Sequence, residues 1–180
     1  MYLFDKDFKE IFFSQIISVI GGLIAGTVLA IYSNKLLIIP GILLLIPSFL
    51  EMRGSISGTL FSRISSGLFL GVIKTNRYNT KIVKGNAVSS FVLSIIVSII
   101  LGFIVFLFNY YILGVFYIWV VFLPILAAII SSIIDIPIVF ISTFYLFKKG
   151  HDPNNIMGPF ITSTGDVISV IGFLVGVLII

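Results

Sequence analysis

The sequence predicts an all-α membrane protein with five transmembrane helices. Of its 180 residues, 59% are hydrophobic and only 10% are charged, and its mean hydropathy is +1.24. A soluble domain usually carries about a quarter charged residues, and a chain this short cannot bury so much apolar surface in a soluble fold. In a bilayer, lipid covers the outer face. The composition therefore excludes a soluble enzyme, a nucleic-acid-binding protein and a disordered chain.

Five apolar runs are each long enough to cross the hydrocarbon core, which takes about 20 residues of helix. No soluble domain and no long linker separates them. Residues 1–180 are therefore expected to form one transmembrane domain without a cytoplasmic regulatory domain. The runs are Phe12–Tyr32, Leu36–Ile73, Val88–Phe108, Phe116–Phe147 and Met157–Ile180.

The first run is expected to be a retained helix rather than a signal peptide, because it is too long and its N-terminal flank mixes both charge signs. Small residues recur at helical spacing in the first and third runs, and such stripes let helix backbones approach closely. These two helices are therefore interpreted as packing helices. Their stripes are Ser14, Ser18, Gly22 and Gly26 in the first, and Ser90, Ser94, Ser98 and Gly102 in the third.

The second and fourth runs are longer than one crossing requires, and each contains two prolines. Proline removes a backbone donor and interrupts helix geometry. The second run holds Pro40 and Pro47, and the fourth holds Pro124 and Pro137. We therefore expect bent or broken helices at both places.

The basic residues predict the orientation, because cytoplasmic loops carry an excess of lysine and arginine. With the N-terminus in the cytoplasm, the cytoplasmic side receives eight basic residues and the outer side receives only Lys35. The C-terminus is then outside. The eight are Lys6, Lys9, Lys74, Arg77, Lys81, Lys84, Lys148 and Lys149.

Several kinds of site are excluded by residue counts. The chain has no cysteine and one histidine, His151, which excludes disulfides, thiolate metal sites and histidine clusters. No catalytic serine–histidine–aspartate set and no phosphate-binding loop is present, so an enzyme is not expected. The informative residues are the ionisable ones inside apolar segments, since such residues are rare and mark ion pathways or buried pairs. They are Glu51, Arg53, Arg63, Asp135 and Asp166.

Asp166 lies in the fifth run, seven residues after Pro159. Because proline suits the first position of a helix, a helix beginning there would place Asp166 about 10 Å along its axis. Thr162, Asp166 and Ser169 share one face at this spacing. Asp166 is interpreted as a cation ligand; the alternative is a buried ion pair with Arg63 or Arg53.

Part of the second run contains more polar residues than a membrane-spanning segment usually does. Glu51, Ser55, Thr59, Ser62 and Ser66 recur at steps of four and three, which predicts a hydroxyl-lined face with a carboxylate at one end. Gly54 and Gly58 would permit an unwound turn whose carbonyls face a cavity. The alternative is an ordinary serine-rich packing face.

Asp135 precedes Pro137 in the fourth run. The proline leaves a carbonyl one turn earlier without its usual donor. That carbonyl would bind a cation or water, or accept from a neighbouring serine. Asp135 therefore joins the candidate ligands.

All of these candidate ligands are oxygen groups, which suit hard cations. Magnesium keeps several waters and binds through one or two carboxylates. Oxygen ligands alone do not separate magnesium from calcium, manganese or sodium. One Asp166 per chain makes a weak site, whereas two copies across a symmetry axis make a better one, so we expect a homodimer with a pore at or near its interface.

Two segments resemble MgtE-type magnesium channels. The loop and last helix of that family are similar to KKGHDPNNIMGPFITSTGDVISV here, with its basic end, D-P, G-P-F and T-S-T-G-D-V. The family's second helix is similar to LEMRGSISGTLFSRISSGLFLGVI. That segment is still more similar to the magnesium solute carriers of eukaryotes and to their archaeal relatives with a single five-helix unit.

The resemblance implies a cation pore between two five-helix units, and magnesium as the transported ion rather than a cofactor. It also implies a metal-binding aspartate at Asp166 and a pore segment from Gly54 to Thr59. Ser55 stands where the bacterial motif has asparagine, and Ser57 where the carriers have an acidic residue. Two other functions fit the residues: exchange of magnesium for sodium or protons, and a non-transporting membrane subunit.

Overall fold

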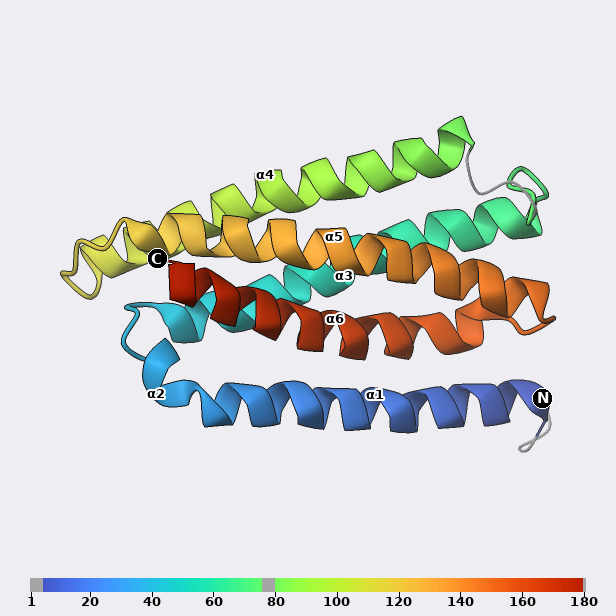
Figure 1. Ribbon diagram of the computed structural model, residues 1–180, viewed down its shortest axis with the longest axis horizontal. Helices are drawn as coiled ribbons and strands as arrows, with labels where there is room; N and C mark the ends of the chain where they lie inside the picture. The colour runs from blue at the N-terminus through green and yellow to red at the C-terminus, as the bar shows by residue number, and fades with distance from the viewer. Residues whose placement is uncertain (1–4, 76–79, 180) are drawn as a thin grey trace.

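The structure, a computed structural model, describes residues 5–75 and 80–179. Within these ranges all regular secondary structure is helical, which confirms the all-α prediction. Figure 1 shows the helices as an elongated bundle. They are α1 (Lys6–Ile31), α2 (Ser33–Leu36), α3 (Ile42–Phe69), α4 (Lys81–Tyr111), α5 (Trp119–Lys148) and α6 (Pro153–Ile179).

The five long helices alternate in direction along the bundle. The start of α1, the end of α3, the start of α4 and the α5–α6 connection lie at one end, and the α1–α3 and α4–α5 connections lie at the opposite end (Figure 1). The lysines that the sequence predicts to be cytoplasmic, as far as the structure describes them, therefore lie at one end of the bundle. Lys35 in α2 lies at the other end. Arg77 lies outside the described residues. This arrangement agrees with the positive-inside pattern.

Within the described residues, four helices are long and apolar enough to cross a membrane: α1, α4, α5 and α6. Helix α3 is not among them. It has 28 residues, which at 1.5 Å per residue is about 42 Å, longer than a hydrocarbon core of about 30 Å. Its length suffices, but its glycines, serines and charged residues lower its apolarity. The structure thus gives four candidate spans, and the fifth remains a prediction.

The second run contains one unbroken helix, α3, which starts after Pro40 and continues through Pro47, so the predicted break within the run is not found. Helix α2 ends at Leu36, and α3 begins at Ile42 after a turn. Gly41 adopts φ +76°, a left-handed conformation that glycine tolerates best. The Asn109 side chain donates from Nδ2 to the Pro40 carbonyl at 2.8 Å, which fixes this turn against α4.

The fourth run also contains a continuous helix. Helix α5 continues without interruption through Pro124 and Pro137, so a break there is wrong. Membrane helices tolerate proline because neighbouring helices and hydroxyl side chains satisfy the freed backbone groups. Ser131 and Thr143 donate to the carbonyls of Ala127 and Val139, each at 2.6 Å, which are not the carbonyls four residues before the two prolines.

Helix α6 begins one and a half turns earlier than Pro159 predicts. Pro153 occupies its first position, and Asp152 Oδ1 accepts from the Asn154 N–H at 2.8 Å. Pro159 lies inside the helix. Asp166 is therefore 13 residues from the helix start, about 20 Å at 1.5 Å per residue, near the middle of a 27-residue helix. The carboxylate lies deeper than the sequence indicated.

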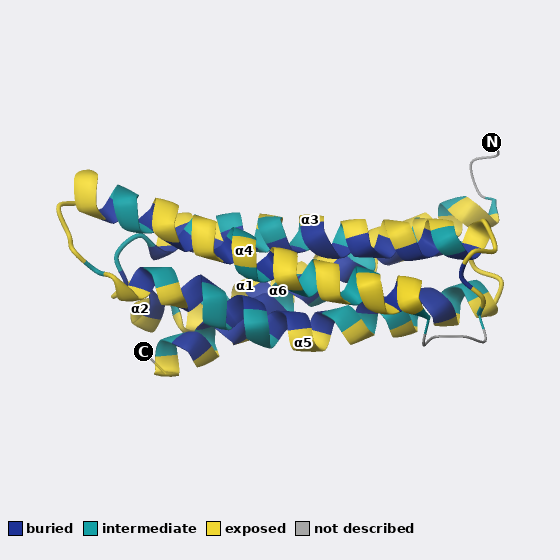
Figure 2. Ribbon diagram, turned by 90° about the horizontal axis from the view of Figure 1, so that it is seen from above, coloured by how far each residue is buried: buried dark blue, intermediate teal, exposed yellow. Residues whose placement is uncertain are grey.

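The core consists of two apolar clusters along the bundle axis. One joins α3, α4, α5 and α6 around Leu45 and Phe49, with the Phe49 and Phe173 rings edge to face at 4.6 Å. The other surrounds Ile64, Val139 and Met157. Figure 2 shows buried and exposed surface alternating along the helices, as expected where one face packs against neighbours. The buried polar residues that lie between the clusters in sequence are Arg53 and Ser57 of α3 and Ser131, Ser132 and Asp135 of α5.

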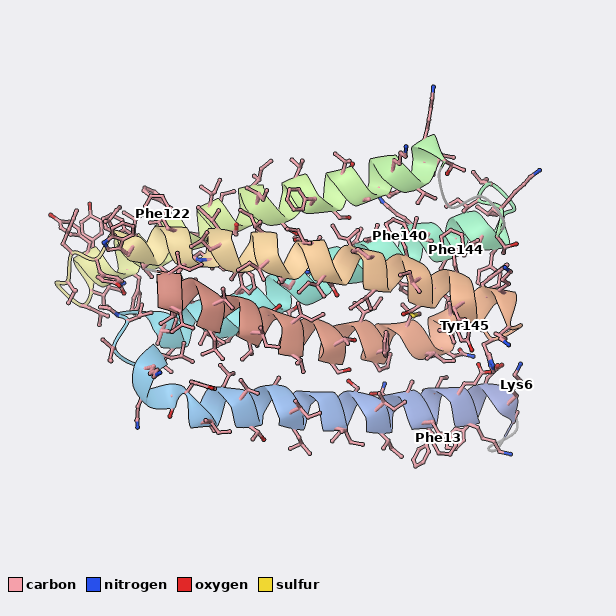
Figure 3. The ribbon with its side chains drawn as sticks, in the orientation of Figure 1. Lys6, Phe13, Phe122, Phe140, Phe144 and Tyr145 are labelled. Atoms are coloured by element: carbon pink, nitrogen blue, oxygen red, sulfur yellow. The ribbon has the colours of Figure 1, made fainter. Side chains whose placement is uncertain are left out.

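Helix α1 packs chiefly against α6 and is tied to the α5–α6 turn by polar side chains. Lys6 Nζ donates to the Gly150 carbonyl at 3.1 Å (Figure 3), and His151 Nδ1 lies 2.9 Å from Glu10 Oε1. Phe13 points away from the bundle and is 61% exposed. One face of α1 therefore contacts protein and the rest is free for lipid.

The small-residue stripe is confirmed in α4 and displaced in α1. Ser94, Ser98 and Gly102 of α4 are buried. In α1, Gly22 and Gly26 have nothing near them, whereas a Cβ on Gly21 would lie 2.6 Å from the Ser163 Cβ of α6. The stripe predicted for α1 is therefore wrong by one residue at its C-terminal half, because several small residues follow each other there.

We expect Gly102→Ala to lower the free energy of unfolding by about 1–3 kcal/mol, the usual effect of overpacking. The added Cβ would lie 2.7 Å from the Val121 carbonyl oxygen and 2.9 Å from its Cα, so α4 and α5 must separate. Reversible denaturation in mixed micelles measures the change. Gly22→Ala is the matched control, because nothing lies within 4 Å of the new methyl group. Equal effects of the two substitutions would contradict close α4–α5 packing.

Candidate functional site

Helix α3 presents two polar faces on opposite sides. Arg53 and Ser57, one turn apart, are buried. Glu51 and Ser55, also one turn apart, are exposed. Two residues correspond to about 200° of rotation on a helix of 3.6 residues per turn, so the two faces point in opposite directions. The predicted hydroxyl face is thus the exposed one, and Ser57 does not belong to it.

The exposed face of α3 lines an open groove of about 800 Å³ that reaches α4. Nothing lies within 4 Å of a Cβ at Gly54 or Gly58, so the helix backbone itself forms part of this surface. The polar residues lining the groove are Ser55, Thr59, Ser62, Arg63, Ser66 and Asn86.

The backbone in the pore segment is regular. Gly54 and Gly58 lie inside an uninterrupted helix, and Thr59 Oγ1 donates to the Ser55 carbonyl at 2.9 Å. The predicted unwound turn is therefore wrong. A regular helix keeps its carbonyls in its own hydrogen bonds, which leaves side-chain oxygens as the groups this segment offers.

Asp166 on α6 and Glu51 on α3 lie close enough to interact electrostatically. Asp166 is half-buried and Glu51 is exposed. Neither carboxylate forms a hydrogen bond or ion pair with another residue in the described part of the chain. Two carboxylates on neighbouring helices thus influence each other without a compensating cationic side chain among the described residues, an arrangement that a cation stabilises.

The two hydroxyls predicted beside Asp166 have different surroundings. Thr162 is exposed, and its Oγ1 donates to the Gly158 carbonyl at 3.1 Å. Ser169 is fully buried, and its Oγ has no partner among the described residues. Thr162 and Asp166 therefore reach the accessible surface, while Ser169 faces the bundle interior.

Asp135 forms a buried ion pair with Arg53. Arg53 Nη2 donates to Asp135 Oδ2 at 2.8 Å, and only 3% and 1% of the two side chains are exposed. Ser57 Oγ also donates to Asp135 Oδ2. Asp135 Oδ2 is thus engaged by protein donors, and Oδ1 is the oxygen left for another ligand.

Asp166 has no arginine partner in the described part of the chain, since neither Arg53 nor Arg63 forms an ion pair with it there. Arg63 instead faces Asn86 at 3.5 Å. The alternative of a buried Asp166–arginine pair is therefore wrong, and the Asp166 carboxylate is free of a cationic side chain in this part of the protein.

Sequence reasoning missed the hydroxyls around Arg53. Its Nη1 donates to Ser132 at 2.9 Å and to Ser94 at 3.1 Å. The sequence did contain helical spacing that indicates these shared faces. Arg53 and Ser57 are four residues apart, and Ser132 and Asp135 are three residues apart. Such spacing places each pair on one helix face, but it does not say which helices meet.

In the described ranges, no three acidic, histidine or cysteine residues gather in a group that could hold a metal ion. One chain therefore offers the Glu51 and Asp166 carboxylates and the hydroxyls near them.

Comparison with known proteins matches a family model to most of the chain. The family model described as MgtE, divalent cation transporter, matches residues 46–176, a range that contains α4, α5, most of α3 and most of α6. No curated protein and no solved structure shows significant similarity to the chain.

Proposed function

This chain belongs to the MgtE family of divalent cation transporters, and on that premise we propose that it carries magnesium across the membrane through a homodimeric pore with Asp166 as a metal ligand. The family is one of transporters rather than enzymes. Magnesium is here the transported ion.

The juxtaposition of Glu51 and Asp166 carries the proposal. These residues come from α3 and α6, interact electrostatically and lack other partners in the described part of the chain. Magnesium usually keeps several waters and binds proteins through one or two carboxylates. Thr162 and Ser55, both exposed, supply hydroxyls on the same two helices. Charged groups at membrane depth are expected to line an ion path.

The homodimer follows from the incompleteness of this site. One chain brings two carboxylates to an open surface. A two-fold axis beside that surface would double the carboxylates and enclose the path between identical walls. The accessible backbone at Gly54 and Gly58 would permit the close approach of helices that such an interface requires.

The proposal includes five membrane crossings, with α3 as the second. A polar helix can span a membrane where protein or water covers its polar face, and a pore supplies that cover. The N-terminus would then be cytoplasmic and the C-terminus outside, in agreement with the gathering of lysines at one end of the bundle.

We expect the purified protein in proteoliposomes to take up magnesium along its gradient, at a rate well above that of protein-free liposomes. A magnesium-sensitive dye inside the vesicles measures the uptake. Dependence on an imposed sodium or proton gradient would show exchange instead of a pore. Absence of uptake by correctly folded dimers would contradict transport and favour a non-transporting subunit.

A further inference from the structure

We infer that the buried cluster of Arg53, Ser57 and Asp135 positions α3 relative to α6 and thereby sets the separation of the Glu51 and Asp166 carboxylates. The part concerning magnesium rests on the proposed function; the part concerning helix position does not. The three residues are called the positioning cluster below.

The positioning cluster joins three helices. Arg53 on α3 donates to Asp135 and Ser132 on α5 and to Ser94 on α4, at 2.8, 2.9 and 3.1 Å. Ser57, one turn further along α3, donates to the same Asp135 oxygen. A guanidinium is planar, and its donors have fixed directions. These contacts therefore fix the rotation of α3 about its own axis as well as its distance from α5.

Rotation of α3 matters because the opposite face carries the candidate metal ligand. Glu51 and Ser55 are each two residues from Arg53, about 200° around the helix. Any rotation that loosens Arg53 from Asp135 moves Glu51 by a comparable angle. The apolar clusters on either side also oppose such a rotation, but apolar contact lacks the fixed directions of the guanidinium donors.

The cluster also reaches the helix that carries Asp166. Asp135 Oδ1 has no hydrogen-bond partner among the described residues, and it lies 4.0 Å from the position of a Cβ on Gly165. Gly165 immediately precedes Asp166. The α5 carboxylate therefore binds α3 through one oxygen and faces the α6 backbone at Gly165 with the other, which places the cluster between the helices that carry Glu51 and Asp166.

The test uses the double variant Arg53→Met/Asp135→Asn, which removes both charges at similar volume. A buried ion pair can often be replaced by neutral groups without loss of the fold. The chain has no cysteine, so spin labels can be attached to cysteines introduced at Leu43 and Ile171, which are 73% and 45% exposed and lie on α3 and α6. Dilution with unlabelled protein restricts the measured distances to one chain.

We expect the label-to-label distance distribution of the double variant to shift or broaden relative to the parent. We also expect the half-saturating magnesium concentration for uptake to rise roughly 10-fold, the usual effect of removing groups that orient metal ligands. An unchanged distance distribution would overturn the inference. Shifted distances without magnesium uptake in either protein would contradict the proposed function and leave the positioning role standing.

Ser57→Ala provides a second test if the double variant does not fold, because it removes one hydrogen bond and no charge. It should shift the same distances in the same direction by a smaller amount. The control is Ser48→Ala, whose hydroxyl donates only within its own helix, to the Leu44 carbonyl at 2.9 Å. An equal response of Ser57→Ala and Ser48→Ala would overturn the inference.

Discussion

Asp166→Ala is expected to reduce magnesium uptake to the level of protein-free liposomes. The substitution removes one of the two carboxylates that interact electrostatically between α3 and α6, and in a homodimer it removes two charges from the proposed path. A divalent cation that leaves bulk water at membrane depth needs such compensation, because an uncompensated charge there is costly. The measurement is dye-reported uptake by parent and variant reconstituted at equal protein content.

The folded state should tolerate this change, since no described residue depends on Asp166 for a hydrogen bond or ion pair. Size-exclusion chromatography and thermal unfolding of the variant should match those of the parent. Asp152→Asn is the control, because it removes a carboxylate from the α5–α6 turn, away from the proposed path, and should leave uptake unchanged. Magnesium uptake at the parental rate by Asp166→Ala would remove Asp166 from the pathway.

The position of Asp166 also shows which structural features the sequence patterns predicted. The apolar runs predicted the long helices, since a helix in lipid must satisfy its backbone groups internally whatever its side-chain propensities. Helix starts were less certain. Pro159 predicted the start of the last helix, but α6 starts at Pro153, directly after the capping residue Asp152. That difference of six residues changes the depth of Asp166 from about 10 Å to about 20 Å along the helix.

Tertiary pairing was harder to predict than helix position. Periodicity placed Asp135 on a helix and Arg53 on another, but it carries no information about which helix faces meet. Arg53 was an equally plausible partner for Asp166 in sequence. The structure pairs Arg53 with Asp135 because α3 turns that face toward α5, and this leaves the Glu51 face for Asp166. The metal role predicted for Ser57 and Asp135 remains untested, and their contacts with Arg53 suggest that they act on the site through helix position.

Asp135→Asn alone is expected to lower the free energy of unfolding by roughly 3–5 kcal/mol, the usual effect of removing one partner of a buried ion pair. The neutral amide keeps the volume but leaves the Arg53 guanidinium, whose side chain is 3% exposed, without a counter-charge. Ser94 and Ser132 still accept from it, but neutral hydroxyls do not balance the charge. Reversible denaturation in mixed micelles measures the loss.

The double variant Arg53→Met/Asp135→Asn should recover most of that stability, because no buried charge then remains unpaired. Recovery of stability without recovery of the parental half-saturating magnesium concentration would separate the two roles of the pair: neutralising charge in the core and orienting α3. Glu51→Gln is the control for charge removal on α3. Its side chain is exposed and unpaired among the described residues, so its effect on stability should stay within about 0.5 kcal/mol. A comparable destabilisation by Glu51→Gln and Asp135→Asn would show that burial of the Arg53–Asp135 pair does not determine the stability of the bundle.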